Sequence, residues 1–490
     1  MINQLDKSRY AGIFSVAPDR KVNGNLSLDG RNTSLYVWDE NFFYPVEGKT
    51  ITGILDNRMK VSLIDCLISG PGSYGRQGDT SNFCTIFPHY VVFGDQHISY
   101  TDKEISKVSF LLDDATTLFH DYNAFGFASD ARSIVKQIVE SGNMDCEIGI
   151  GNRPLVAYYT GKQEIFSSNT VHGTISASHA PGYTMGSSRG VKIDNTIYIH
   201  IKFDEAITFM DVVDRLWKAK RFFELIVGRA QNLVECIIDT GTDEKPQPLD
   251  VYSSMTPKYQ RPEKDFEIIW QDVLIDAVRN PNRFSDVLAA WLERENIWRD
   301  ARERFFQSFE KQKNYHINRL ISAANMFDIM PEAAFPEPEK LPSDLNDAKE
   351  KAKKIFKELP QTAERDSVLS ELGRVGSLRL KRKIASRCSC LLSRIGERLP
   401  ELSLVTDEAV NCRNHYVHGS ESRIDYNKEP NIQFFLTDTL EFVFAASDLI
   451  DAGWDIVAWC ETGYHVHHPL GAYMERYSSE LEKLKSLLPT

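Results

Sequence analysis

The hydrophobic repeat of this chain changes near residue 204, and that change limits the possible folds more than any other feature. Before it, apolar residues alternate with a period of two, most clearly in Thr196–Phe203, which is typical of a half-buried strand. After it, apolar residues from Ile207 to Ile237 recur at the spacing of an amphipathic helix. The sequence therefore predicts an α+β multidomain protein with a β-rich N-terminal half and an all-helical C-terminal half.

Four more segments of the first half have the β-branched and aromatic composition of strands, and Gly, Asp and Asn clusters separate them. They are Leu35–Trp38, Val61–Leu67, Thr85–Phe93 and Val108–Leu112. The glycine-rich segment Ser69–Gly78 lacks the Lys-Ser/Thr of a phosphate-binding loop. It predicts a surface loop.

Two proline-rich segments, Asp239–Asp265 and Met330–Asn346, interrupt the helical pattern and predict extended connectors. We expect a β-rich or mixed sensor or regulatory domain at residues 1–238 that ends in a long helix. Residues 239–299 would form a connector with linking helices, and residues 300–490 a helical domain. A chain of 490 residues suits two to four domains.

Charge and terminal composition limit the class of protein. The net charge of −12 argues against a protein that coats nucleic acid, although a local basic groove is compatible with it. Met1–Arg20 has no apolar core of a signal peptide, and no stretch reaches the roughly 18 apolar residues of a membrane span. The eight scattered cysteines fit reduced thiols. These features predict a cytoplasmic protein that does not enter a membrane.

The segment most informative about chemistry is Thr406–Gly419. Thr406 or Asp407 is expected to cap the start of a helix, and Gly419 to end it. Asn414 and His418 lie four residues apart and share a helix face. Arg413 lies about 140° away from His418 around an ideal helix, but its long side chain can reach across, and fraying at Gly419 would bring the two closer.

These residue types suit RNA cleavage without a metal or cofactor, because RNA carries its own nucleophile, the 2′-hydroxyl. An imidazole such as that of His418 ordinarily titrates near pH 6.5 and serves as a general base or acid. The guanidinium of Arg413 would grip the scissile phosphate. Asn414 would orient the imidazole or bind a phosphate oxygen. The expected products carry 2′,3′-cyclic phosphate and 5′-hydroxyl ends.

The pattern Arg413-Asn414-x-x-x-His418 in a C-terminal helical region resembles the HEPN superfamily of ribonucleases. The β-rich front, which opens with Tyr10-Ala-Gly-Ile-Phe and a later Val22-Asn-Gly-Asn-Leu, resembles that of ApeA-type abortive-infection proteins. The resemblance implies a helical bundle, homodimers or higher homo-oligomers with paired motifs facing a shared cleft, and metal-independent endoribonuclease activity. It also implies a role in defence against bacteriophage, in which a phage-derived trigger acts on the N-terminal domain. The main alternative is a catalytically silent HEPN module that binds RNA or dimerises.

A basic segment, Arg374–Arg398, lies before the motif and contains one acidic residue, Glu397. It predicts a phosphate-binding surface for the RNA substrate. The residues expected to contact RNA are Arg379, Lys381, Arg382, Lys383 and Arg387. The alternative is a solvated helix face on which these residues pair with acids such as Glu371.

Other groupings admit weaker interpretations. A zinc site is conceivable from cysteines and histidines of the C-terminal half, but their spacing is not that of common zinc sites, and buried thiols explain the cysteines better; the residues are Cys388, Cys390, Cys412, Cys460, His465, His467 and His468. Asn318, Asn325 and Asp328 are best explained as ordinary polar positions on a helix, with a cleft lining as the alternative. A third interpretation makes the β-rich half a ligand-binding or hydrolytic domain that uses its histidines at 89, 97, 120 and 172.

Overall fold

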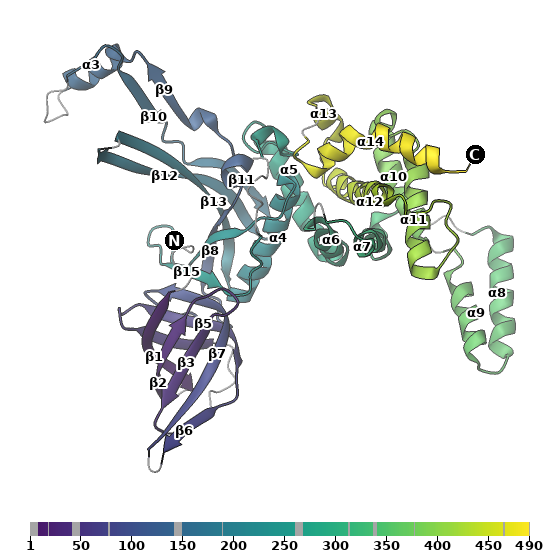
Figure 1. Ribbon diagram of the computed structural model, residues 1–490, viewed down its shortest axis with the longest axis horizontal. Coiled ribbons are helices and arrows are strands. Elements are labelled where there is room, and N and C mark those ends of the chain that lie inside the picture. The colour runs from purple at the N-terminus through teal and green to yellow at the C-terminus, as the bar shows by residue number, and fades with distance from the viewer. Residues whose placement is uncertain are drawn as a thin grey trace. The chain divides into compact units, whose positions relative to one another are not determined.

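The computed structural model describes the chain except for residues 1–7, 18, 42–49, 77–78, 142–148, 189, 260–267, 312–313, 337–340, 377, 464–465 and 490. It divides into two compact units, residues 1–293 and 294–490. The first unit is β-rich and the second is helical (Figure 1), so the predicted order of fold classes is confirmed. Within the described residues, no helix is both long and apolar enough to cross a membrane.

The strands of the first unit form one large antiparallel sheet and a separate two-stranded ribbon, β9–β10. The strands are β1 (Arg9–Ala17), β2 (Arg20–Ser27), β3 (Ser34–Asp39), β4 (Thr50–Leu55), β5 (Lys60–Ile68), β6 (Gly72–Arg76), β7 (Asp79–Gly94), β8 (Ile105–Leu112), β9 (Phe125–Ser129), β10 (Leu155–Tyr159), β11 (Glu164–Thr170), β12 (Gly173–Ser187), β13 (Gly190–Ile207), β14 (Leu233–Asp239) and β15 (Pro248–Ser253). The unit's α-helices are α2 (Ala115–Leu118), α3 (Arg132–Glu140), α4 (Phe209–Val227) and α5 (Pro281–Glu293).

Six of these strands close into a barrel in the order β7-β3-β2-β1-β4-β5, because β5 pairs back with β7. Alternate side chains point inward and fill it, including Phe14, Leu35, Val61 and Ile86, all fully buried. Closure leaves no free edge on the barrel strands. Beyond β7 the sheet continues through β15, β14, β8, β13, β12 and β11.

Two predictions for this unit were wrong in detail. The helix expected over Ile207–Ile237 is α4, which ends at Val227 because Gly228 adopts a left-handed conformation (φ 90°) that favours glycine. The chain then turns into β14 and β15, so the predicted connector from residue 239 contributes a strand to the sheet. The predicted loop Ser69–Gly78 also contains a strand, β6, which pairs with β7; Gly78 lies outside the described residues.

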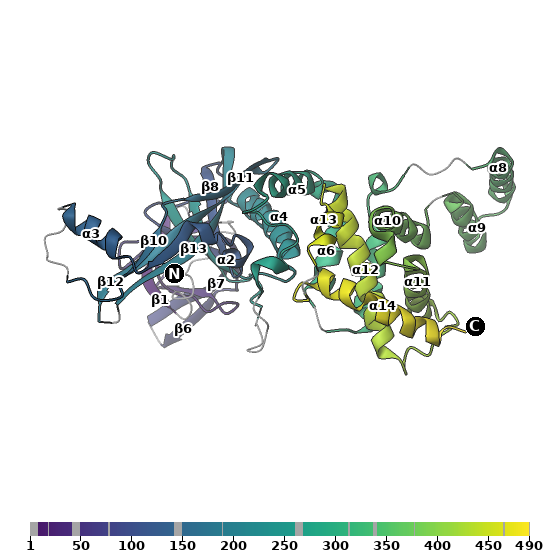
Figure 2. The ribbon, with the colours of Figure 1, turned by 90° about the horizontal axis from the view of Figure 1, so that it is seen from above.

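The second unit is a helical bundle around α12 (Pro430–Asp451), which packs against α6, α7, α10, α11 and α14 (Figure 1 and Figure 2). The other helices are α6 (Glu295–Phe309), α7 (Ile317–Asp328), α8 (Ser343–Glu358), α9 (Ala363–Arg374), α10 (Leu380–Ile395), α11 (Leu402–His418), α13 (Ile456–Glu461) and α14 (Pro469–Leu487). Sixteen residues of α12 are buried, as expected of a helix with neighbours on every side. α8 and α9 pack on each other.

A buried ion cluster ties α6 to α12. Asp448 receives two hydrogen bonds from Arg302 (2.9 and 3.0 Å) and one ion pair from Arg294 (2.8 Å). Burial alone would raise the pKa of Asp448, but the two arginines outweigh it and hold that pKa below its usual range. The carboxylate is therefore a structural anion of the bundle.

We expect Asp448→Asn to destabilise the protein by about 3–5 kcal/mol, because Arg294 and Arg302 lose the buried counter-charge that they share, although Arg302 keeps its ion pair with Glu295. Calorimetry of the full chain should show the melting temperature lowered by roughly 10 °C. The exposed change Glu475→Gln on α14 is the control and should leave the temperature almost unchanged. Equal melting temperatures for the two variants would show that the cluster contributes little stability.

Candidate active site

The helix that carries the motif, α11, begins earlier than expected. It starts at Leu402, so neither Thr406 nor Asp407 caps it; the Thr406 hydroxyl instead donates to the Leu402 carbonyl (3.1 Å). Its end was predicted correctly: Gly419 adopts φ 67°, and its N–H donates to the His415 carbonyl (2.9 Å). The last turn, with the motif, therefore reaches the surface while the first turns remain buried.

Arg413 is the centre of the site. Its Nη1 donates to Asn414 Oδ1 (3.0 Å) and lies 3.0 Å from His418 Nε2, and its Nη2 donates to Asn325 Oδ1 (3.2 Å) on α7. Arg413, Asn414 and Asn325 are half-buried, and His418 is exposed. The long arginine side chain thus joins residues that the helical repeat alone separates.

The contact between Arg413 and His418 fixes the tautomer. A guanidinium only donates hydrogen bonds, so His418 Nε2 accepts from Arg413 Nη1, and the proton of the neutral ring is on Nδ1. In this arrangement the lone pair of Nε2 faces the cation that would bind a phosphate.

Two lysines of α10 flank the motif. Lys381 Nζ donates to Asn411 Oδ1 (3.0 Å), which lies two residues before Arg413, and Lys383 Nζ donates to the Asp328 carbonyl (2.5 Å) at the end of α7. Arg382 is exposed. Arg379 is 71% exposed and pairs with Glu371 at 3.4 Å, the acid that the sequence suggested as a partner. Four basic side chains are therefore at the surface near the start of α10.

The prediction that Arg387 contacts RNA was wrong. Arg387 is 4% exposed, and its guanidinium donates to Ser447 Oγ (3.0 Å), the Ala334 carbonyl (2.8 Å) and Asp451 Oδ2 (2.6 Å). Lys383 lies one helical turn before Arg387 and contacts the end of α7, whereas the side chain of Arg387 points toward α12. Arg387 holds the bundle together instead.

A second set of contacts supports the C-terminal turn of α11. The buried Glu408 accepts from the Tyr426 hydroxyl (2.5 Å) and from Asn411 Nδ2 (3.1 Å). Gln433 of α12 donates to the Tyr416 hydroxyl (3.0 Å) and to the Tyr426 carbonyl (2.8 Å). These bonds fasten the chain after Gly419 back onto α11, so the motif rests on a fixed support.

Asn325 was misjudged from the sequence, where an ordinary polar position was preferred for it. Its contact with Arg413 spans 88 positions of the chain, and no local pattern reveals such a pairing. A weak signal exists: Asn325 lies between the buried Ala324 and Met326. Asn318, seven residues earlier, is exposed, as predicted.

The other candidate clusters are not assembled. Among the described residues, no three His, Cys, Asp or Glu side chains are grouped to hold a metal ion; His465 lies outside that part of the chain. Burial raises the pKa of Cys388 and of Cys412 to about 12, which keeps both as neutral thiols. In the N-terminal unit, His172 is buried and His97 is half-buried, and burial lowers the pKa of each.

Two known protein families match this chain. The family described as ApeA N-terminal domain 1 matches residues 9–291, more than half of the chain, and the Apea-like HEPN family matches residues 321–456. The chain belongs to the ApeA family. No curated protein and no solved structure gave a match.

The HEPN match places the candidate site inside the family's domain. Residues 321–456 contain most of α7 and all of α10, α11 and α12, so they include Asn325 and the whole motif. The ApeA-type N-terminal match ends within α5, at residue 291. Together the two matches assign the chain to a family of HEPN-containing defence effectors.

Proposed function

We propose that this ApeA-type protein is a metal-independent endoribonuclease that acts in defence against bacteriophage. The observation that carries the proposal is the 3.0 Å contact between Arg413 Nη1 and His418 Nε2 at the surface end of α11. It puts a phosphate-binding cation and a proton-transferring group within reach of one phosphodiester. The lysines at 381 and 383 would bind the neighbouring phosphates.

The chemistry begins when a scissile phosphate draws Arg413 away from His418. Arg413 then binds the non-bridging oxygens, where negative charge develops, and Nε2 of His418 becomes available as a base. Removal of the 2′-hydroxyl proton lets that oxygen attack phosphorus, the bond to the 5′-oxygen breaks, and a proton is delivered to the leaving oxygen. The products carry a 2′,3′-cyclic phosphate and a 5′-hydroxyl.

Purified protein should cleave RNA in excess EDTA and leave an all-deoxy strand of the same sequence intact, because the nucleophile belongs to the RNA. Gel analysis of both substrates measures this. Strict dependence on added Mg²⁺ or Mn²⁺ would eliminate the mechanism. Binding of RNA without cleavage, identical in wild type and His418→Ala, would instead identify a catalytically silent module.

Asn325→Ala should lower the cleavage rate by roughly tenfold, since a hydrogen bond to a charged group is worth about 1.5–3 kcal/mol and Arg413 would lose its only described contact with α7. The loss should be mainly in kcat, because the residue orients Arg413 and not the RNA. Asn318→Ala on the exposed side of the same helix is the control. Equal rates for the two variants would show that Asn325 has no role in positioning.

The proposal includes a composite site formed by two protomers. Cleavage needs a base and an acid, but one motif supplies one imidazole at position 418. A two-fold dimer would bring two copies of Arg413, Asn414 and His418 to one cleft.

An active ribonuclease would also damage its own cell, so we propose that the N-terminal unit restrains the nuclease until a phage-derived trigger acts on it.

A further inference from the structure

A separate cavity of about 160 Å³ lies between α12 and α14. Its lining combines three aromatic rings with charged and polar groups: Asn431, Phe434, Phe435, Asp438, Tyr473, Arg476 and Glu480. On α12 these residues recur at positions 431, 434, 435 and 438, and on α14 at 473, 476 and 480, so each helix contributes one continuous face. A cavity of about 150 Å³ holds a group the size of benzene.

The carboxylate of Asp438 lines this cavity, is 12% exposed, and has weak charge compensation. Both its oxygens accept from the Tyr315 hydroxyl (2.7 and 2.9 Å). The nearest cations are Arg476 at 3.3 Å and Arg319 at 3.8 Å. Arg319 donates two shorter hydrogen bonds to Glu441, at 2.8 and 2.9 Å. Burial and the charge of Glu441 raise the pKa of Asp438 to about 6.

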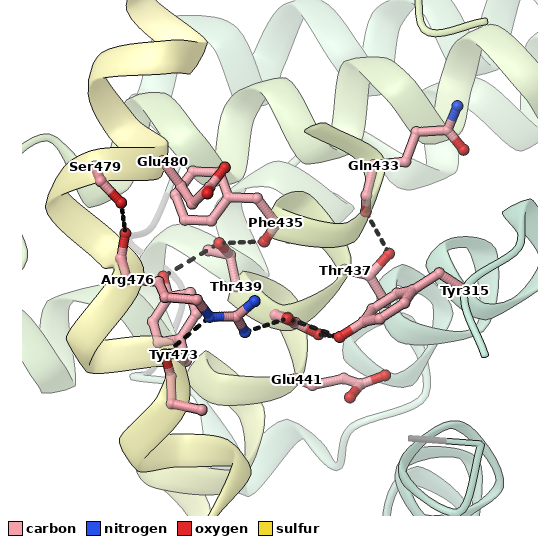
Figure 3. Close-up of polar contacts among 12 residues, drawn as sticks. Tyr315, Gln433, Phe435, Thr437, Thr439, Glu441, Tyr473, Arg476, Ser479 and Glu480 are labelled. Atoms are coloured by element: carbon pink, nitrogen blue, oxygen red, sulfur yellow. Dashed lines mark hydrogen bonds and ion pairs between the residues drawn. The ribbon is translucent and has the colours of Figure 1, made fainter. Parts of the chain in front are cut away.

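The cavity already holds a guanidinium, but loosely. The side chain of Arg476 is 56% exposed, and its Nη2 reaches Asp438 at the long distance of 3.3 Å. Figure 3 shows Arg476 and Tyr315 pointing toward one another, with Tyr473 and Glu480 beside the arginine. Glu480, 17% exposed, pairs with the exposed Lys483 at the surface. A tighter cation could therefore replace Arg476 without breaking a buried ion pair.

We propose that this cavity is a binding site for a small organic cation, a guanidinium or alkylammonium group that displaces Arg476 from Asp438. A carboxylate such as Asp438 and aromatic rings in the lining of one cavity are the combination that attracts such cations. A metal ion fits less well, since no three metal-binding side chains gather among the described residues. The cation has two possible sources, a free amine or an arginine side chain of another protein.

Calorimetric titration of the full chain with agmatine, spermidine and N-acetylarginine amide tests the proposal. Asp438→Asn, which keeps the size of the side chain, should weaken binding by about tenfold or more, the effect of one lost ion pair in a partly buried site. Arg476→Ala should tighten binding several-fold, because the internal competitor is gone. The control Lys485→Ala removes an exposed cation of the same helix that pairs with Glu401 and should bind as wild type does.

The pH dependence gives an independent readout. The titratable and charged groups that act on Asp438 are Tyr315, Arg319, Glu441 and Arg476, and Glu480 lines the same cavity. Because the pKa of Asp438 is raised to about 6, its carboxylate is protonated below that pH, and affinity should fall as the pH is lowered through this value. The fall should be absent in Asp438→Asn.

The arms of the titration separate the two sources. Equal binding of N-acetylarginine amide and agmatine would identify a protein side chain as the natural cation, whereas binding of the free amines alone would identify a metabolite. Unchanged affinity in Arg476→Ala would overturn the proposal, since that variant should gain binding and a simple folding defect cannot produce a gain. Absence of binding of all three probes at millimolar concentration in both wild type and Arg476→Ala would overturn it as well.

Discussion

His418→Ala and Arg413→Ala should each reduce RNA cleavage by about a hundredfold or more, the usual effect of losing a proton-transfer group or a charge-stabilising cation. Both should also abolish any protection against phage. The side chains lie at the surface end of α11, and the described partners of Arg413 are Asn325, Asn414 and His418. Their removal should therefore leave the fold intact, which melting temperatures would check. Asn414→Ala should lose less, because it holds Arg413 and transfers no proton.

Matched controls exist close to both residues. His415 lies on the same helix, and its Nδ1 contacts the Ser420 carbonyl at 2.8 Å, so His415→Ala removes an imidazole outside the motif. Arg423→Ala removes an exposed arginine of the following loop. Both controls should keep most of the activity. If Arg413→Ala did so too, its role as the phosphate clamp would be wrong.

Mixing Arg413→Ala subunits with His418→Ala subunits should restore measurable cleavage from two inactive proteins. In a mixed dimer, one protomer contributes Arg413 and the other His418, so a composite site regains one copy of each group. The mixture should be dissociated and allowed to reassociate before the assay, and each variant treated alone in the same way is the control. Activity should stay below that of the wild type, because only part of the dimers is mixed and each has one imidazole.

If the active site is shared by two protomers, the specific activity should depend on protein concentration. Specific activity of the wild type should fall on dilution as dimers dissociate. Full specific activity in a protein shown by light scattering to be monomeric would refute the shared cleft. It would leave the single-chain site of Arg413, Asn414 and His418 as the active unit.

Short-range patterns predicted the elements well and their ends less well. The strand Thr196–Phe203 was recognised because its alternation is local, and β13 contains it. The helix expected to reach Ile237 stops at Val227, since the left-handed turn at Gly228 ends it although apolar residues continue in β14. A strand buried on one face and a helix end both present apolar residues, so periodicity alone does not separate them.

In the candidate site, too, contacts within one helix were predicted and contacts between helices were not. The helical repeat alone separates Arg413 from His418, but the length of the arginine side chain predicted that it could reach the histidine, and the two lie 3.0 Å apart. Arg387 and Asn325 were both misjudged because each depends on a helix distant in sequence: Arg387 contacts Asp451 of α12, and Asn325 contacts Arg413 of α11. Charge density along α10 does not reveal which of its sides faces the bundle core.

The measurement that tests the central claim most directly is a map of RNA ends in cells expressing either the wild-type protein or His418→Ala. A method that captures 2′,3′-cyclic phosphates should find new ends of this type in wild-type cells, each paired with a 5′-hydroxyl on the downstream fragment. The same positions should be uncut in His418→Ala cells at equal protein level. New ends with 3′-hydroxyl and 5′-phosphate chemistry, or identical maps from the two proteins, would contradict the account.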